Sequence, residues 1–138
     1  MRILALDHGE VRVGAAVCDP TETIARPAGV LGADPAEVLS LAAELEAELV
    51  VVGLPLTLSG EEGEQAQSAR AYAAELEQLL DVEVETYDER LTTRMADSSA
   101  RAGAGAPQDA LAAAHLLESY LQRRAGPAPR PGEPQPDE

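Results

Sequence analysis

The sequence predicts an α/β fold in which helices flank a mixed five-stranded sheet. Residues 2–7 and 12–18 are apolar runs separated by only a tight turn, so they must pair as antiparallel strands. Helical and strand patterns then alternate along the rest of the chain. A β-meander followed by such alternation is typical of a mixed sheet and not of an all-parallel, doubly wound one.

Each further element has its own signal. A short third strand is expected within residues 23–31, where Pro27 interrupts the pattern. Asp34, Pro35 and Glu37 supply an N-cap, a proline at the first helical position and a capping-box glutamate, so a helix begins there. The β-branched run at residues 49–52 ends at a glycine and predicts a central parallel strand.

The second half of the chain predicts a helix over about 62–80, whose apolar stripe consists of Ala66, Ala69, Ala73, Leu76 and Leu80. Residues 82–87 alternate apolar and acidic side chains, which predicts an edge strand with one face in water. A helix within 92–102, a flexible stretch at 103–107 and a last helix from 109 to about 123 complete the order.

The chain of 138 residues fits one domain, expected at residues 1–124. Residues 125–138 hold five of the ten prolines and no large apolar side chain, which predicts a disordered tail. No run approaches the ~20 apolar residues of a membrane span, and no signal peptide begins the chain. We therefore expect a cytoplasmic protein without a membrane partner, in which Cys18, the lone cysteine, is buried.

The formal net charge of -15 argues against a nonspecific nucleic-acid binder, because such proteins neutralise phosphates with basic side chains. Net charge is global whereas recognition is local, and bound divalent metals would cancel several carboxylate charges where a phosphate must lie. All ten basic residues are arginine, which favours bidentate phosphate contacts. A biased genome composition would give the same count.

Acidic residues follow the predicted strand ends. Asp7 ends a buried strand, where a carboxylate needs a cation or a metal; capping of the following turn explains it equally well. Asp88 and Glu89 end the 82–87 strand and would reach the same sheet edge if that strand runs parallel to the first; otherwise they are solvated loop acids. Asp109 lies in line with a core-facing stripe of the last helix, or caps its N-terminus.

These acids supply oxygen ligands from separate segments and no cysteine or histidine cluster, which suits Mg²⁺ or Mn²⁺. Hydrolysis of a phosphodiester by two such ions needs an acidic set of this kind. Gly9 and Gly14 would let a phosphate approach the hairpin backbone. Arg90 and Arg94 are the best candidates for phosphate contacts, with Arg12 and Arg70 weaker. For His8 and His115 we expect packing, structural or surface roles.

Four blocks resemble the YqgF family, in order LALDHGEVRVGAAVCD, VVGLPLTLSGEEGEQAQSARAYAAEL, YDERLTTRMA and DALAAAHLLESYL. Members of that family are described as RuvX-type Holliday-junction resolvases or pre-16S rRNA nucleases with a ribonuclease H-like fold. The resemblance implies metal-binding catalytic acids at Asp7, Glu89 and Asp109. Where family members often carry a longer basic loop before the last acid, this chain has RAGAGAPQ, with Arg101 its one cation.

The resemblance favours a metal-dependent nuclease that processes the 5′ end of pre-16S rRNA, with the pre-30S particle as a further partner. A resolvase of branched DNA and a phosphate-binding assembly factor without turnover are the alternatives. The Asp7-x-Gly9 pattern is also similar to the phosphate loop of actin-like ATPases, but 138 residues cannot supply their second lobe. Nothing in the residues selects RNA over DNA.

Overall fold

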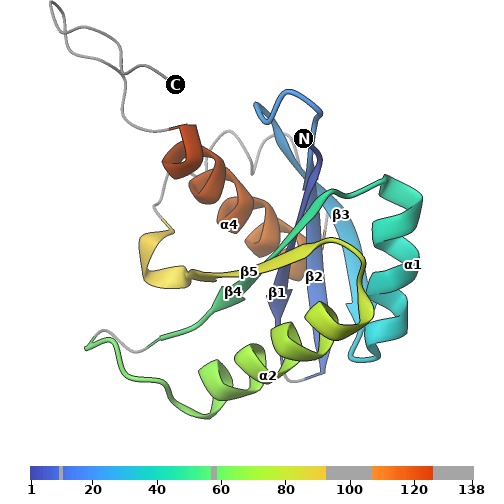
Figure 1. The fold of residues 1–138 in the computed structure, drawn as a ribbon. Helices are drawn as coiled ribbons and strands as arrows, with labels where there is room; N and C mark the ends of the chain where they lie inside the picture. The colour runs from blue at the N-terminus through green and yellow to red at the C-terminus, as the bar shows by residue number, and fades with distance from the viewer. Residues whose placement is uncertain (10, 57–58, 93–106, 126–138) are drawn as a thin grey trace, which may run out of the picture.

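The computed structural model describes residues 1–9, 11–56, 59–92 and 107–125, and their strands form one sheet in the order β3-β2-β1-β4-β5 (Figure 1). The predicted helix within 92–102 and the tail beyond Ala125 lie outside these residues, apart from Thr92. No helix in the described part of the chain is long and apolar enough to cross a membrane.

The sheet is mixed, as the sequence predicts. β1 (Ile3–His8) pairs antiparallel with β2 (Arg12–Cys18), which pairs antiparallel with β3 (Ala25–Gly32). On its other side β1 pairs parallel with β4 (Leu49–Leu54), which pairs parallel with β5 (Glu83–Asp88). The carboxyl ends of β1, β4 and β5 therefore lie at one edge of the sheet, and β5 is an edge strand.

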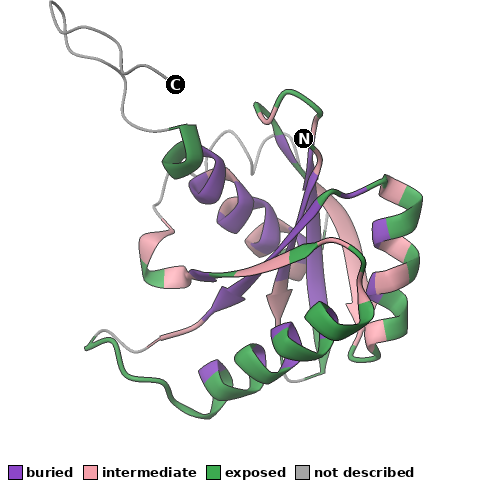
Figure 2. Cartoon of the chain, viewed as in Figure 1, coloured by how far each residue is buried: buried purple, intermediate pink, exposed green. Residues whose placement is uncertain are grey.

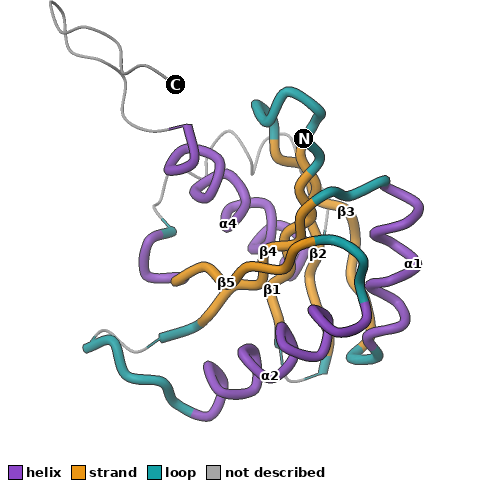
Figure 3. The backbone as a smooth tube through the Cα atoms, in the orientation of Figure 1, coloured by secondary structure: helices purple, strands orange, loops and turns teal. Residues whose placement is uncertain are grey.

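Helices cover both faces of the sheet (Figure 3). α4 (Gln108–Ala125) packs on one face, mainly against β1, β2 and β3, while α1 (Pro35–Leu45) and α2 (Glu64–Leu79) lie on the other. A single 3₁₀ turn, η1 (Glu89–Leu91), follows β5. Gly63 caps α2, so this helix begins two residues later than the sequence predicts.

The sheet separates two apolar cores, which account for the buried central strands in Figure 2. Because side chains alternate along a strand, Ile3 and Ala5 join the core under α4 whereas Leu4 and Leu6 join the core under α1 and α2. β4 is buried along its whole length, as a central parallel strand requires. This arrangement holds the acidic strand ends on a rigid frame.

The third strand is longer than the sequence predicts, because Pro27 does not interrupt it. β3 is the second edge strand, and a proline is tolerated where one side of the backbone faces no partner. Ala15 pairs with Gly29 and Ala16 with Pro27, so β3 carries one extra residue at a bulge. Gly29 adopts a φ of 123°, which favours glycine.

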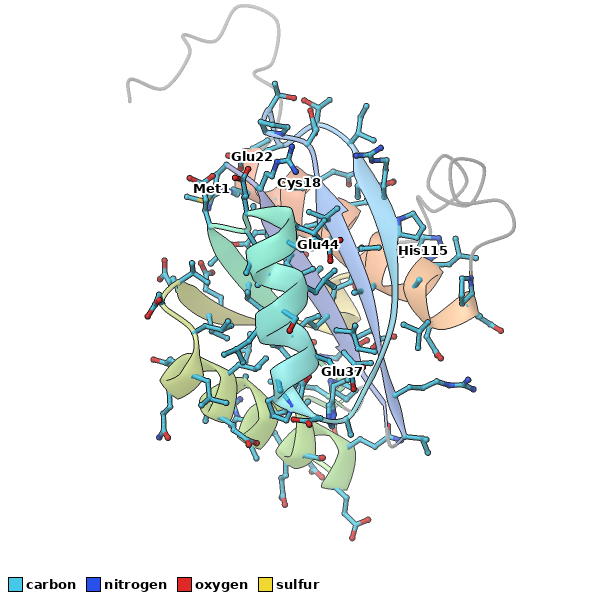
Figure 4. All side chains as sticks on the ribbon, turned by 90° about the vertical axis from the view of Figure 1, so that its right-hand side faces the viewer. Met1, Cys18, Glu22, Glu37, Glu44 and His115 are labelled. Atoms are coloured by element: carbon cyan, nitrogen blue, oxygen red, sulfur yellow. The ribbon has the colours of Figure 1, made fainter. Side chains whose placement is uncertain are left out.

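Cys18 is buried at the end of β2, as predicted, and lies near Met1 and Glu22 in Figure 4. The backbone N–H of Ile3 donates a hydrogen bond of 3.2 Å to its Sγ atom. Burial raises the pKa of the Cys18 thiol, which keeps it protonated and unreactive. Its role in this structure is packing.

Candidate active site

Three strand ends bring Asp7 and Glu89 to one edge of the sheet. Leu6 pairs with Val52, and Gly53 pairs with Tyr87, so Asp7 and Gly53 are level on neighbouring strands. Glu89 follows directly after β5, as the first residue of η1. The parallel orientation of β5, on which the predicted meeting of Asp7 with this segment depended, is confirmed.

Gly53 leaves the space through which Glu89 reaches across β4. A Cβ atom at Gly53 would lie 3.2 Å from the Glu89 Cδ and 3.0 Å from a Leu116 methyl. Both contacts are tighter than ordinary van der Waals separation, so the glycine is where the carboxylate crosses the central strand. Asp88, by contrast, turns toward Arg90 and does not join Asp7.

The Asp7 and Glu89 side chains share a hydrogen bond, in which a protonated Glu89 donates to Asp7. Burial is the largest cause that raises the pKa of Glu89 to about 7, and the nearby Asp7 charge adds to it. Burial also raises the pKa of Asp7, although the hydrogen bond from Glu89 lowers it in part. Two half-buried acids without a cation therefore hold one proton between them near neutral pH.

Asp109 lies in the first turn of α4 and is close enough for its charge to raise the pKa of Asp7 further. Its side chain pairs with Arg12 instead, whose Nε atom lies 3.0 Å from the Asp109 Oδ2. Among the described residues, no three His, Cys, Asp or Glu side chains are grouped as ready metal ligands. The three acids predicted from the sequence are thus neighbours, of which two are in direct contact.

Gly14 was predicted to let a phosphate approach the hairpin backbone. That prediction is wrong at this residue, because the space beside Gly14 is filled by α4. A Cβ atom there would overlap the Asp109 backbone, at 1.9 Å from its carbonyl oxygen. The first turn of α4 fills the space that the glycine leaves on β2. This contact fixes the backbone of Asp109 relative to β1.

The carboxylate pair opens onto a pocket of about 230 Å³, lined by Asp7, His8, Gly9, Pro55, Gln65, Ser68 and Glu89. The His8 ring packs on Tyr72 of α2, with ring centroids 4.5 Å apart, so the predicted packing role is confirmed. His8 also lines this pocket, which the sequence does not indicate. Gln65 and Ser68 are two further lining residues that were not predicted, and their spacing of three residues on α2 places them on one helix face.

The arginines predicted to contact phosphate all have carboxylate partners where the structure describes them. The Arg90 guanidinium donates to Asp88, with Nη2 2.7 Å from Oδ2, and Arg12 pairs with Asp109. Arg70 pairs with Glu62. Arg94 lies outside the described residues. Arg12, Arg70 and Arg90 do not line the pocket, whose described lining contains no arginine.

The donor chemistry of this site fits a hard divalent cation. Asp7 and Glu89 offer carboxylate oxygens in contact with each other, and a cation between them would replace the shared proton. Asp109 is the third oxygen donor nearby once its side chain leaves Arg12. His8 is half-buried, and burial lowers the pKa of its ring, which keeps it neutral beside the acids.

The chain path is that of a ribonuclease H-like protein. The chain superposes on the Thermus thermophilus RuvC structure solved in complex with a Holliday junction substrate with a TM-score of 0.69, at 16% identity over 93% of this chain and 98% of that one. A second Thermus thermophilus RuvC structure gives a TM-score of 0.61 at 17% identity. Identity this low establishes the fold alone, and it confirms the predicted fold class.

The family follows from sequence comparison: the chain belongs to the RuvX family, described as a Holliday junction resolvase family, whose model matches residues 1–123. A relative in Anaeromyxobacter sp. strain K is 44% identical, with 91% of this chain and 99% of that protein covered. A relative in Chloroflexus aurantiacus is 40% identical over 91% of this chain and 90% of its own length. Both carry the name "Putative pre-16S rRNA nuclease".

Proposed function

We propose that this protein is a metal-dependent nuclease that hydrolyses phosphodiester bonds at the pocket beside Asp7 and Glu89. The single observation that carries the proposal is the carboxylate pair itself, half-buried and open to a pocket of about 230 Å³. Two half-buried carboxyl groups side by side lower the stability of an already acidic protein. Such a pair is therefore typical of a functional site. Membership of a family of nucleases agrees with this reading.

In the proposed reaction Asp7, Glu89 and Asp109 would hold Mg²⁺ or Mn²⁺, with two ions expected. Bound there, such ions would supply Lewis-acid stabilisation of the phosphate charge and a more acidic water. Asp7 and Glu89 release their shared proton as they bind the cation, so the site loads best above the pKa of Glu89. His8 and Tyr72 support this edge of the pocket, because the packed rings fix its wall on α2.

We further propose that the substrate is structured RNA, with processing of the 5′ end of pre-16S rRNA as the reaction. The names of relatives that match nearly their whole length support this choice. Branched DNA is the second candidate, supported by the description of the family and by the junction complex of the RuvC with the same fold. Cleavage assays separate the two.

A pre-ribosomal particle is the partner we propose for an RNA-processing role. The chain has ten arginines, no lysine and a net charge of -15, and the described pocket lining carries no arginine. A ribosomal protein or other assembly protein would supply the positive surface that the described pocket lining lacks. Co-sedimentation with 30S precursors tests this partner, and its absence from the particle fraction would rule the partner out.

The decisive experiment compares a 5′-extended 16S rRNA precursor with a four-way DNA junction, each with Mg²⁺ or Mn²⁺. The Asp7→Asn variant should lose at least about 100-fold in cleavage rate, since ligand loss exceeds the 10- to 100-fold effect of a lost supporting contact. Asp81→Asn is the matched control, because Asp81 is exposed and precedes β5 at the end remote from the pocket.

The outcomes distinguish the candidates. Cutting of the RNA alone supports the rRNA nuclease, and cutting of the junction alone supports the resolvase. Inactivity on both from folded, Mn²⁺-binding protein, together with normal 16S maturation in cells that carry Asp7→Asn, would overturn the nuclease in favour of an assembly factor without turnover.

A further inference from the structure

The contact between Arg12 and Asp109 joins two residues that the proposed reaction uses differently. Arg12 begins β2, Asp109 lies in the first turn of α4, and their charged atoms are 3.0 Å apart. One is a candidate phosphate contact and the other a candidate metal ligand. In this structure the two side chains pair with each other. Arg12 is therefore not available to a phosphate, and Asp109 is not available to a metal ion.

The backbone of Asp109 is held in place, so only its side chain can move toward a new partner. The absence of a side chain at Gly14 seats the Asp109 backbone directly on β2 and fixes its distance from Asp7 on the neighbouring strand. The negative charge of Asp109 is close enough to disfavour the ionised form of Asp7. Rotation about the Asp109 side-chain bonds is therefore the movement by which a third oxygen could join the Asp7–Glu89 pair.

The ion pair is also easy to break. The Arg12 side chain is 68% exposed and that of Asp109 is 43% exposed, and exposed pairs contribute little to stability. A phosphate offers a guanidinium a bidentate, charge-assisted contact, which is stronger than a single-point pair with a carboxylate. A cation at Asp7 attracts the released carboxylate at the same time. Both interactions favour an exchange of partners, in which Arg12 leaves Asp109 for the phosphate and Asp109 leaves Arg12 for the cation.

We propose that Arg12 is a positioning residue that holds Asp109 away from the metal site until a substrate phosphate binds the guanidinium. The exchange couples the substrate to the completion of the carboxylate set, so that substrate and cation each strengthen binding of the other. This inference rests on the proposed nuclease function, and it assigns Arg12 a part in metal loading that a simple phosphate contact would not have.

The test is a double-mutant cycle on metal affinity without substrate, with Mn²⁺ binding measured by titration calorimetry. Arg12→Gln should bind Mn²⁺ at least about fivefold more tightly than the wild type, the lower end of ordinary couplings between sites, because Asp109 is released. In an Asp109→Asn background the same substitution should change the affinity less than about twofold. Arg26→Gln, on β3, is the control for loss of one positive charge.

An equal gain in both backgrounds, or a gain for Arg26→Gln, would overturn the exchange, because it would show only a general charge effect. The reciprocal arm needs neither metal nor turnover: binding of a labelled RNA in EDTA should tighten for Asp109→Asn and not for the double variant. If both arms give the expected changes, inactivity of the folded protein together with normal 16S maturation in Asp7→Asn cells would overturn the nuclease and leave the exchange of partners supported. Unchanged affinity in both arms would overturn the exchange alone.

Discussion

The shared proton of Asp7 and Glu89 makes the stability of the fold depend on pH in the direction opposite to that of a salt-bridged carboxylate. A salt-bridged carboxylate has a lowered pKa and stabilises the fold as pH rises, whereas burial raises the pKa of Glu89 from 4.5 to about 7. The folded chain therefore binds this proton more tightly than the unfolded chain. Loss of the proton weakens the fold unless a cation replaces it.

Metal-free protein should lose stability as pH rises from about 4.5 to about 7, the window between the unfolded and folded pKa values of Glu89. Glu89→Gln should remove most of this dependence, since an amide keeps a hydrogen-bond donor without titrating. Urea unfolding of both proteins at pH 5 and pH 8 in EDTA measures the effect. Parallel changes in the two proteins would contradict it, and excess Mg²⁺ at pH 8 should restore the wild type alone.

Gly53 supports the site through the space it leaves. A Cβ there would press on the Glu89 side chain at 3.2 Å and on a Leu116 methyl at 3.0 Å. Gly53→Ala should therefore weaken Mn²⁺ binding, by about 10- to 100-fold if Glu89 behaves as a ligand with a disturbed support. Calorimetry measures this, with Gly63→Ala as control because nothing lies within 4 Å of that position. Equal affinity for the two variants would count against Glu89 as a ligand.

At the scale of elements, the seating of α4 on β2 depends on Gly14. Its missing side chain admits the Asp109 carbonyl, and a Cβ would be only 1.9 Å from that oxygen. Gly14→Ala should move the first turn of α4 and cost about 1–3 kcal/mol of unfolding free energy or more, as overpacking does. Gly63→Ala should cost less than about 1 kcal/mol, the size of N-cap preferences. Chemical denaturation compares the two.

The elements themselves were largely predictable, because hydrophobic period and capping residues are local signals. The capping set at Asp34 fixed the start of α1, and the alternation in residues 82–87 identified an edge strand. The effect of Pro27 was not predictable, because it depends on whether β3 lies inside the sheet or at its edge. Local sequence does not contain that information.

The contacts of the candidate site also differ in how far the sequence can predict them. The meeting of Asp7 and Glu89 follows from parallel strand ends, so sequence could predict it conditionally. The pair of Arg12 with Asp109 joins residues far apart in sequence and depends on how α4 seats on Gly14. Gln65 and Ser68 reach the pocket because α2 packs on the sheet, with Ala66 and Ala69 in one cluster with Leu54. Such contacts come from tertiary packing, which periodicity does not describe.

At the scale of the whole molecule, charge is what separates this chain from ordinary nucleic-acid-binding proteins. The net charge of -15 repels a polyanion at long range, and the described pocket lining contains neither arginine nor lysine. Acidic residues also lie along α1, among them Glu37 and Glu44, which Figure 4 labels. Attraction must then come from a few arginines and from divalent cations at the carboxylates.

This balance predicts a shallow dependence of RNA binding on monovalent salt. Each phosphate neutralised by a basic side chain adds about -0.9 to the slope of log affinity against log salt for duplexes, so Arg12 and Arg90 alone give about -2. Fluorescence anisotropy with a labelled RNA hairpin at fixed Ca²⁺, over 50–200 mM KCl, measures the slope. Arg12→Gln should flatten it by about 1, whereas Arg26→Gln should leave it unchanged. A slope near -6 would contradict this prediction, because it requires about six or seven arginine–phosphate contacts, whereas Arg12 and Arg90 supply two.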